Sequence, residues 1–401
     1  MLKKKSTLHE KHKIGYKKAI ELLKDCSTPF GFIAAKKKTK NGNYTRIWAR
    51  DSMICSIAAL KTSNKFLHET AKKSLITLLK YQHKQGEIVS NVDPNTAAVS
   101  FGGTAGRIDS NLWFIIGFSS YVRKTKDVAF AKKYFSQVTK TIHILRIHEY
   151  NHKGLLYIPL AGDWADEYIQ EGYVLYDEIL YYLAYTEYAY LKKILKKTYK
   201  EDVHKAKRIK ELIQQNFWVN TLKKNLYSPS LYKRALEKKK PYFAPYFNPG
   251  GYGNYFDLFA HSLAILTNIT TKSQKSSITR FIKETFPENN IPAFYPVIKS
   301  SSKKFLILKQ NFSVVFRNKP YEYHNGGVWP MVLGFYIASK PPHAKKNLTY
   351  LIDTVSENEW EFNENYNGKT NRAIGTPLQA WSAAGVILAY KGIYTKKEVF
   401  K

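Results

Sequence analysis

Six polar loops recur along the chain, and each one leads directly into a segment with helical periodicity. Counted from Asp51, Asp109, Asp166, Asp257, His324 and Thr376, their spacings are 58, 57, 91, 67 and 52 residues. Each interval has room for one helical hairpin and its connections, and a recurring unit of this size is typical of repeat architectures. If six hairpins close into a ring, the loops before the inner helices gather at one end of it.

Hydrophobic periodicity predicts helices between these loops. In residues 71–82, for example, Leu75, Leu78 and Leu79 fall near one helical face. We expect about twelve helices, over residues 9–25, 51–62, 65–82, 110–124, 127–147, 172–197, 200–215, 255–269, 273–284, 328–339, 342–355 and 377–392. Strand signals are short, and residues 305–316 predict a β-hairpin.

These patterns predict an all-α fold, an (α/α)6 toroid of six helical hairpins with short β-hairpins in its loops. No Pro-, Gly- or Ser-rich linker divides the chain, so we expect a single catalytic domain over residues 1–401. Its motif-bearing part runs from about residue 44 to residue 392.

The charge balance is strongly basic, with 64 Lys and Arg against 31 Asp and Glu and a net charge of +33. The lysines occur in short runs scattered along the chain, whereas nucleic-acid binders tend to gather basic charge on one face and to use arginine. We therefore expect no specific nucleic-acid partner. A basic helical protein that binds nucleic acid remains the alternative, and it predicts salt-sensitive affinity.

Cysteine usage and hydropathy limit the compartment and the cofactors. The two cysteines, Cys26 and Cys55, cannot form a disulfide framework in 401 residues, which favours a reducing, cytoplasmic location. No Cys/His cluster has metal-ligand spacing, and neither a secretory signal nor an apolar stretch of about 18 residues is present. We expect no metal, no organic cofactor and no membrane association; the oligomeric state is left open.

The most acidic stretch, residues 160–178, contrasts with this basic chain. Glycoside hydrolysis commonly needs two carboxyl groups, one protonated to help the leaving oxygen depart and one ionised. A proton donor needs a pKa raised by burial or by a neighbouring carboxylate, and Asp163, Asp166 and Glu167 beside Trp164 offer both. The alternative for this segment is a solvated acidic loop.

The second carboxyl group must come from another loop. Glu364 lies in a turn-like polar segment, followed by Asn, Tyr, Asn and Gly. Glu359 and Glu361 fit the solvated end of a helix better. Glu364 is therefore the candidate base.

Other loops supply the residue types that bind sugars. Trp48, Arg50 and Asp51 combine an aromatic platform, a donor and an acceptor, which sugar rings and hydroxyls require. The alternative is that Asp51 caps the following helix and pairs with Arg50. Capping is favoured for Asp109 taken alone, and likewise for Asp257. Taken with the other loops, Asp109, Trp164 and Glu167 are also expected to bind the sugar.

The loop "HNGGVWP" adds His324 and Trp329 beside two glycines that permit close backbone approach. A lone histidine is more often structural, but these neighbours favour a binding role. Gln379 belongs to the last loop and could line the same pocket.

Taken in order, the loops resemble those of inverting glycoside hydrolases built as a ring of six helical hairpins. These include the debranching amylo-1,6-glucosidases, processing α-glucosidases, glucoamylases and alkaline/neutral invertases. "WARDS" resembles the pair that holds the non-reducing sugar, "RIDSNLWF" an invertase segment, "EYHNGGVWP" a loop shared by invertases and debranching enzymes, and "GTPLQAWSAAG" the debranching ending.

The resemblance implies roles for three carboxylates. "WADE" followed by "DEILYYLAY" is similar to a debranching pattern in which the aspartate, here Asp166, is the general acid and the glutamate, here Glu178, binds sugar. "FNENYNG" resembles the invertase loop that carries the catalytic base, here Glu364. Asp163 is kept as the alternative acid.

The resemblance also has departures that bear on the substrate. The invertase acid loop "DRRMG" is absent, and "DEIL" lacks the glutamine of the debranching pattern. We therefore expect hydrolysis, with inversion, of an α-glycosidic bond at a terminal sugar of an oligosaccharide or disaccharide, as in an α-glucosidase or amylo-α-1,6-glucosidase. The alternatives are a neutral/alkaline invertase acting on sucrose and a non-catalytic carbohydrate-binding protein on the same scaffold.

Overall fold

The computed structural model describes residues 7–36, 43–312, 314–357, 359–395 and 398–400, and helices dominate this part of the chain. The helices are α1 (Leu8–Asp25), α2 (Ala49–Lys61), α3 (Lys65–Lys80), α4 (Ile108–Thr125), α5 (Val128–Ile147), α6 (Leu175–Ile194), α7 (Lys200–Asn216), α8 (Pro229–Leu236), α9 (Leu258–Leu266), α10 (Lys272–Thr285), α11 (Lys303–Gln310), α12 (Pro330–Ala338), α13 (Ala344–Ser356) and α14 (Ala380–Tyr394).

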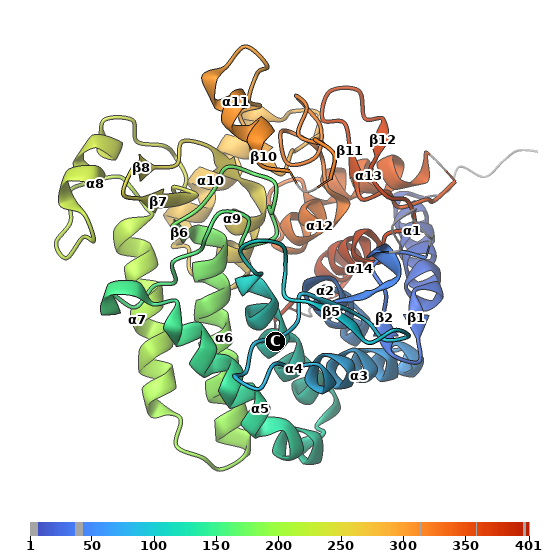
Figure 1. Cartoon of the computed structure of the whole chain (residues 1–401). Helices are drawn as coiled ribbons and strands as arrows, with labels where there is room; N and C mark the ends of the chain where they lie inside the picture. Colours follow the sequence, from blue (N-terminus) through green and yellow to red (C-terminus); the bar gives the residue numbers. More distant parts are fainter. Residues whose placement is uncertain (1–6, 37–42, 313, 358, 396–397, 401) are drawn as a thin grey trace, which may run out of the picture.

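Six of these helices form a closed inner ring. Each contacts the next in the order α2, α4, α6, α9, α12 and α14, and α14 packs back against α2. Outer helices lie against this ring, so that α3 packs on α2, α5 on α4, α7 on α6 and α13 on α12 (Figure 1). The predicted (α/α)6 toroid is confirmed, and the six polar loops precede the six inner helices.

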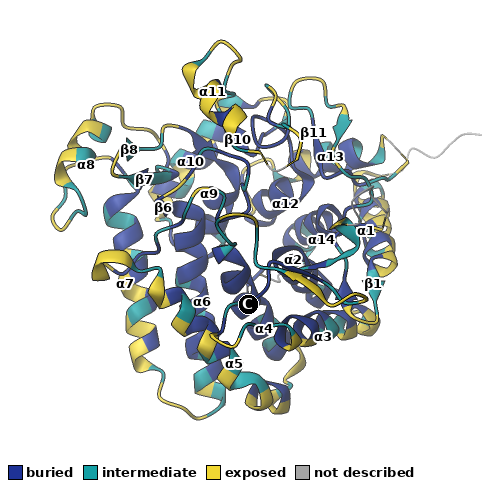
Figure 2. Ribbon diagram, viewed as in Figure 1, coloured by how far each residue is buried: buried dark blue, intermediate teal, exposed yellow. Residues whose placement is uncertain are grey.

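Burial explains which helices lie inside. All nine residues of α12 are buried, whereas α7 buries only one face (Figure 2). Two glycines allow α12 and α14 to approach closely, because a Cβ at Gly334 would stand 2.3 Å from the carbonyl oxygen of Gly385. The buried apolar side chains form one connected cluster around the ring.

Short antiparallel ladders decorate the loops. They are formed by β1 (Ser27–Thr28) with β2 (Gly31–Phe32), β3 (Ile47–Trp48) with β4 (Asn91–Asp93) and β5 (Ala98–Ser100), β6 (Tyr173–Val174) with β7 (Tyr246–Asn248) and β8 (Gly251–Tyr252), β9 (Phe256–Asp257) with β10 (Phe294–Tyr295), and β11 (Asn365–Tyr366) with β12 (Ala373–Ile374).

Two local expectations are wrong. The segment predicted as a hairpin begins with helix α11, because Phe305 and Leu308, three residues apart, are both buried while Leu306 and Ile307 face outward. Helix α8 has no counterpart among the predicted helices. No helix in the described part of the chain is both long and apolar enough to cross a membrane.

The expected capping carboxylates divide into two kinds. Asp257 does cap α9, since its Oδ1 accepts the backbone N–H of Ala260 at 2.9 Å. Asp51 and Asp109 instead lie within the first turns of α2 and α4, whose N-caps make no side-chain cap bond. The capping expectation for Asp109 is therefore wrong.

Candidate active site

A cavity of about 640 Å³ opens at the end of the ring where the inner helices begin. The beginnings of α2, α4, α12 and α14, the loop before α6 and the segment before β11 all contribute to its wall. The charged and aromatic side chains that line it are Tyr44, Arg46, Trp48, Arg50, Asp51, Arg107, Trp164, Asp166, Arg317, Tyr323, Trp329, Glu364 and Trp381.

An ion-pair network of buried side chains connects the beginnings of α2 and α4 at the cavity. Arg50 donates from Nη1 to Asp109 Oδ2 at 2.8 Å, and its Nε lies 3.9 Å from Asp51 Oδ2. Asp109 is fully buried beneath the wall, where it also accepts the hydroxyl of Tyr176. Burial raises the pKa of Asp51 to about 7, although Arg50 opposes this rise.

Three tryptophans form an aromatic wall. Trp329 meets both Trp164 and Trp381 edge to face, with ring centroids 5.6 and 5.7 Å apart. The buried ring of His324 stacks on Trp329 at 5.0 Å and an interplanar angle of 8°. Burial lowers the pKa of His324, which favours its neutral form at neutral pH.

Asp166 reaches the cavity from the loop before α6. Its Oδ2 accepts Arg107 Nη2 at 2.9 Å, and its Oδ1 lies 3.8 Å from His324 Nε2. Burial alone would raise the pKa of Asp166, but the contacts with His324 and Arg107 outweigh it and hold the pKa below its ordinary value. The carboxyl group is therefore ionised in the unliganded cavity.

Glu364 enters the cavity from the segment before β11. Its side chain is buried, and its Oε1 accepts the hydroxyl of Tyr44 at 3.1 Å. Burial raises the pKa of Glu364, while Arg317 and the Tyr44 hydroxyl oppose the rise. Gly375 packs against it, and a Cβ there would stand 2.7 Å from Glu364 Oε2.

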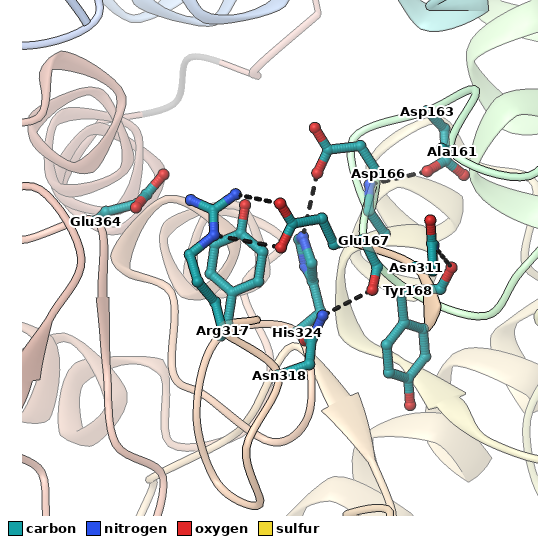
Figure 3. Close-up of polar contacts among 12 residues, drawn as sticks. Ala161, Asp163, Asp166, Glu167, Tyr168, Asn311, Arg317, Asn318, His324 and Glu364 are labelled. Atoms are coloured by element: carbon teal, nitrogen blue, oxygen red, sulfur yellow. Dashed lines mark hydrogen bonds and ion pairs between the residues drawn. The ribbon is translucent and has the colours of Figure 1, made fainter. Parts of the chain in front are cut away.

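An ion pair of the partly exposed Arg317 with the buried Glu167 stands between the two carboxyl groups in the close-up view (Figure 3). Glu167 accepts Arg317 Nη2 at 2.7 Å and Nε at 3.2 Å, and Asn318 Nδ2 donates to the Glu167 backbone oxygen. This bidentate contact holds Arg317 in the cavity wall. Among the residues that the structure describes, no group of three or more His, Cys, Asp or Glu could hold a metal ion.

The structure brings many of the predicted site residues to the cavity. Those in its wall are Trp48, Arg50, Asp51, Trp164, Asp166, Trp329 and Glu364. Asp109, Glu167 and His324 lie behind the wall and contact Arg50, Arg317 and Asp166, respectively. These three residues therefore contact side chains of the cavity wall but do not line the cavity themselves.

Three predicted residues lie elsewhere. Asp163 is buried outside the wall, where its oxygens accept the N–H of Ala165 and the amide of Gln170. Glu178 is fully buried and accepts the backbone N–H of Leu156, so the structure does not bring it to the cavity. Gln379 is fully buried just before α14 and is likewise outside the wall.

Several wall residues were not predicted. They are Tyr44, Arg46, Arg107, Arg317, Tyr323 and Trp381. All of them except Arg317 belong to polar loops that the spacing had already marked, and their aromatic or guanidinium groups were the available signal. Tyr323 is the first residue of "YHNGGVWP". Arg317 lies six residues before it, and no pattern distinguishes Arg317 from the other basic residues.

Sequence comparison identifies the family to which this ring and cavity belong. The family described as alkaline and neutral invertase matches residues 15–229 and 189–395, which together span most of the chain. The chain belongs to the alkaline and neutral invertase family. This is a family of glycoside hydrolases, so the predicted enzyme class is confirmed.

Individual relatives are distant. Probable alkaline/neutral invertase D of Arabidopsis thaliana is 29% identical over 139 residues, which is 32% of this chain and about a quarter (25%) of the relative. Probable alkaline/neutral invertase A, chloroplastic, of the same plant is 22% identical over 441 residues and covers 92% of this chain and 68% of the relative.

Solved structures share the fold at low identity. An uncharacterized conserved protein from Thermus thermophilus superimposes with a TM-score of 0.68 at 13% identity, over 93% of this chain and 99% of that one. A bacterial glucoamylase complexed with acarbose gives 0.66 at 14% identity, over 96% of this chain and 56% of the other. The predicted ring of six hairpins is thus found in other glycosidases.

Proposed function

We propose that the protein hydrolyses a glycosidic bond at a terminal sugar with inversion, with Asp166 as general acid and Glu364 as general base. The observation that carries this proposal is that both carboxyl groups line one cavity walled by tryptophans. Asp163 is a weaker candidate for the acid, because it lies outside the wall with both oxygens engaged. The single apolar cluster supports one catalytic domain over residues 1–401.

In this mechanism Asp166 gives its proton to the glycosidic oxygen while Glu364 removes a proton from the attacking water. The water approaches the sugar from the face opposite the leaving group, and inversion requires carboxyl groups about 6.5–9.5 Å apart. The tryptophan faces stack on the sugar ring, and Arg50 with Asp51 binds its hydroxyls. Tyr44 and Arg317 orient Glu364.

The acid role requires a proton that the unliganded Asp166 does not hold. Its pKa is lowered by His324 and Arg107, whereas burial acts in the opposite direction. We propose that the glycosidic oxygen displaces the Arg107 guanidinium from Asp166 when substrate binds. Burial would then be opposed by the contact with His324 but no longer by Arg107, so the pKa of Asp166 would rise and favour uptake of a proton.

Sucrose is the first substrate to test, because the named relatives are invertases. An α-glucoside such as maltose or isomaltose is the second, since the loops before α6 and α14 resemble those of debranching enzymes more than those of invertases. Parallel assays of both kinds decide between them. Binding of these sugars without turnover would instead support a carbohydrate-binding protein on this scaffold.

The roles of the two carboxyl groups can be separated with an activated substrate. Asp166→Asn and Glu364→Gln should each lower kcat on the natural substrate by orders of magnitude. A glycosyl fluoride needs little acid assistance, because fluoride leaves readily. Asp166→Asn should therefore recover much of its activity on the fluoride, and Glu364→Gln should not.

Each outcome has a definite meaning if circular dichroism confirms that both variants are folded. If Glu364→Gln instead recovers activity on the fluoride, Glu364 is the general acid and Asp166 is the general base. Wild-type turnover by either variant on the natural substrate would remove that residue from the mechanism. Product anomers observed by NMR during turnover test inversion separately.

A further inference from the structure

The cavity wall carries an excess of cationic side chains. It contains the guanidinium groups of Arg46, Arg50, Arg107 and Arg317 but only the carboxyl groups of Asp51, Asp166 and Glu364. Three of the arginines have a carboxylate partner within 3 Å, namely Asp109, Asp166 and Glu167. Arg46 is the exception.

Arg46 is held in place by neutral groups. Its Nη1 donates to the amide oxygen of Asn91 at 3.0 Å, and its backbone bonds to Asn43 and Ala34 fix the chain on either side. Within the described part of the chain, no carboxylate lies within 4 Å of its guanidinium group. Asp93, on the same strand as Asn91, is outside the wall and accepts the N–H of Asn95. That bond is the main cause that lowers the pKa of Asp93, and the charge of Arg46 adds a small contribution.

The burial of the wall residues places Arg46 between the floor and the mouth. Arg50 and Asp51 are 7% and 6% exposed, whereas Val314 and Val315 on the wall are 68% and 66% exposed. Arg46 and Trp48 have intermediate exposure. If the terminal sugar is held by Arg50 and Asp51, as proposed above, Arg46 is left on the wall for the leaving-group part of the substrate.

We propose that Arg46 binds an anionic group, a carboxylate or a phosphate, on the leaving-group part of the substrate. This inference rests on the proposed hydrolase function and specifies its substrate class. A guanidinium group presents a planar fork of donors that matches both anions, and such charge-assisted contacts are about twice as strong as neutral ones. In the unliganded cavity the other three arginines are engaged by carboxylates of the protein, and Arg107 also donates to the backbone oxygens of Gly106 and Ala161.

Matched substrate pairs test the proposal. One pair is sucrose and sucrose phosphorylated on its fructose unit, and the other is glucosylglycerol and glucosylglycerate. They differ in the charge of the leaving group and separate phosphate from carboxylate. We expect the wild-type enzyme to prefer the anionic member of at least one pair in kcat/KM by about tenfold to a hundredfold.

Three variants assign that preference to Arg46. Arg46→Gln should reduce the anionic-to-neutral ratio of kcat/KM to near one, and Arg46→Lys should keep part of it because the charge remains. Arg280→Gln, on the exposed face of α10, is the matched control and should keep the wild-type ratio. Raising the salt concentration should lower the wild-type ratio but not that of Arg46→Gln.

The failure of this inference differs from failure of the hydrolase function. Equal turnover of both members of each pair by the wild type, or an unchanged ratio in Arg46→Gln, would overturn the anion site while leaving hydrolysis intact. If no substrate is turned over, the hydrolase proposal fails. Calorimetric titration with glucosylglycerate and phosphorylated sucrose then decides the anion site, which is overturned if wild type and Arg46→Gln bind both equally.

Discussion

Two groups of carboxylates, all buried except the partly exposed Asp166, lie near each other but in different electrostatic surroundings. At the cavity, Asp109, Asp166 and Glu167 each contact an arginine within 3 Å. Beneath the loop before α6, Asp163, Asp177 and Asp257 are buried and form no ion pair with any described residue. Burial raises the pKa of all three of these core carboxyl groups, and that of Asp257 reaches about 7.

The comparison shows that burial alone does not determine the charge of a carboxyl group. An adjacent guanidinium group keeps Asp166 ionised, whereas a carboxyl group buried without a cation holds its proton towards neutral pH. The catalytic proposal needs one protonated and one ionised carboxyl group. Removal of the cation beside a cavity carboxylate should therefore leave that carboxylate in surroundings like those of the core group.

Removal of a cavity arginine should have the largest effect. Arg50→Met leaves Asp109 fully buried without its cation, which should lower the free energy of unfolding at neutral pH by about 3–5 kcal/mol. Urea unfolding measures this loss. Arg280→Met on the surface should change stability by less than about 0.5 kcal/mol.

The double variant Arg50→Met/Asp109→Leu sharpens this result, because it removes both charges. It should be more stable than Arg50→Met alone. If Arg50→Met unfolds at the wild-type urea concentration, the cavity carboxylates do not depend on their arginines.

A core carboxyl group should instead give a pH-dependent effect. The pKa of Asp257 is raised to about 7 in the folded protein, so its contribution to stability is present at low pH and is lost as the pH rises through 7. Asp257→Asn should keep the cap on α9 without this loss. The variant should gain on the wild type between pH 5 and pH 8, by at most about 3 kcal/mol.

Urea unfolding at the two pH values measures the difference. The exposed carboxylate of Asp25 supplies the control, and Asp25→Asn should change stability by less than about 0.5 kcal/mol at both values. A relative gain of Asp257→Asn towards low pH would contradict the assigned direction of the shift.

Gly375→Ala should shift the carboxyl group of Glu364 without changing the charge of any residue in the cavity. The new Cβ would stand 2.7 Å from Glu364 Oε2, and the backbone has a φ of +73°. Displacement of the carboxyl group by about 1 Å should lower kcat on the order of 10²-fold. Gly251→Ala also has a positive φ, of +138°, but open space around its Cβ, so it reports backbone strain alone and should keep kcat.

The ring of helices could be predicted from the sequence because its determinants are local. Each polar loop precedes a helix that is apolar on more than one face, and this order sets the inner helices. Helix α11 was mistaken for a hairpin because its outward-facing Leu306 and Ile307 are apolar. Its burial depends on contacts that the sequence pattern does not show.

The site was predictable only in part, because a side chain's direction depends on helical rotation. Glu178 and Gln379 lie next to inner-helix starts, as Arg50 and Asp51 do, yet they face away from the cavity. Asp51 and Asp257 both occur where a helix begins, and only the structure separates the cavity residue from the cap. Arg317, outside the polar loops, carries no signal in a chain with 64 basic residues.

Glu364 belongs to neither group of carboxylates, because both burial and neighbouring polar groups act on its pKa. Tyr44→Phe tests one of these neighbours. Burial raises the pKa of Glu364, while Arg317 and the hydroxyl of Tyr44 oppose the rise. Removal of the hydroxyl should raise the pKa further, because a hydrogen bond that favours the ionised form is lost. Because a general base acts when ionised, the acidic limb of the kcat/KM profile should then move to higher pH.

The pH profile of Tyr44→Phe also checks the assignment of the two roles. Tyr150→Phe, at an exposed ring outside the cavity, is the control and should leave both limbs in place. If the alkaline limb moves instead of the acidic one, Glu364 acts as the proton donor, and Asp166, held ionised by His324 and Arg107, becomes the base. Which limb of the profile moves therefore decides the role of Arg107. It must leave Asp166 before the reaction if Asp166 is the acid, and it can stay in contact if Asp166 is the base.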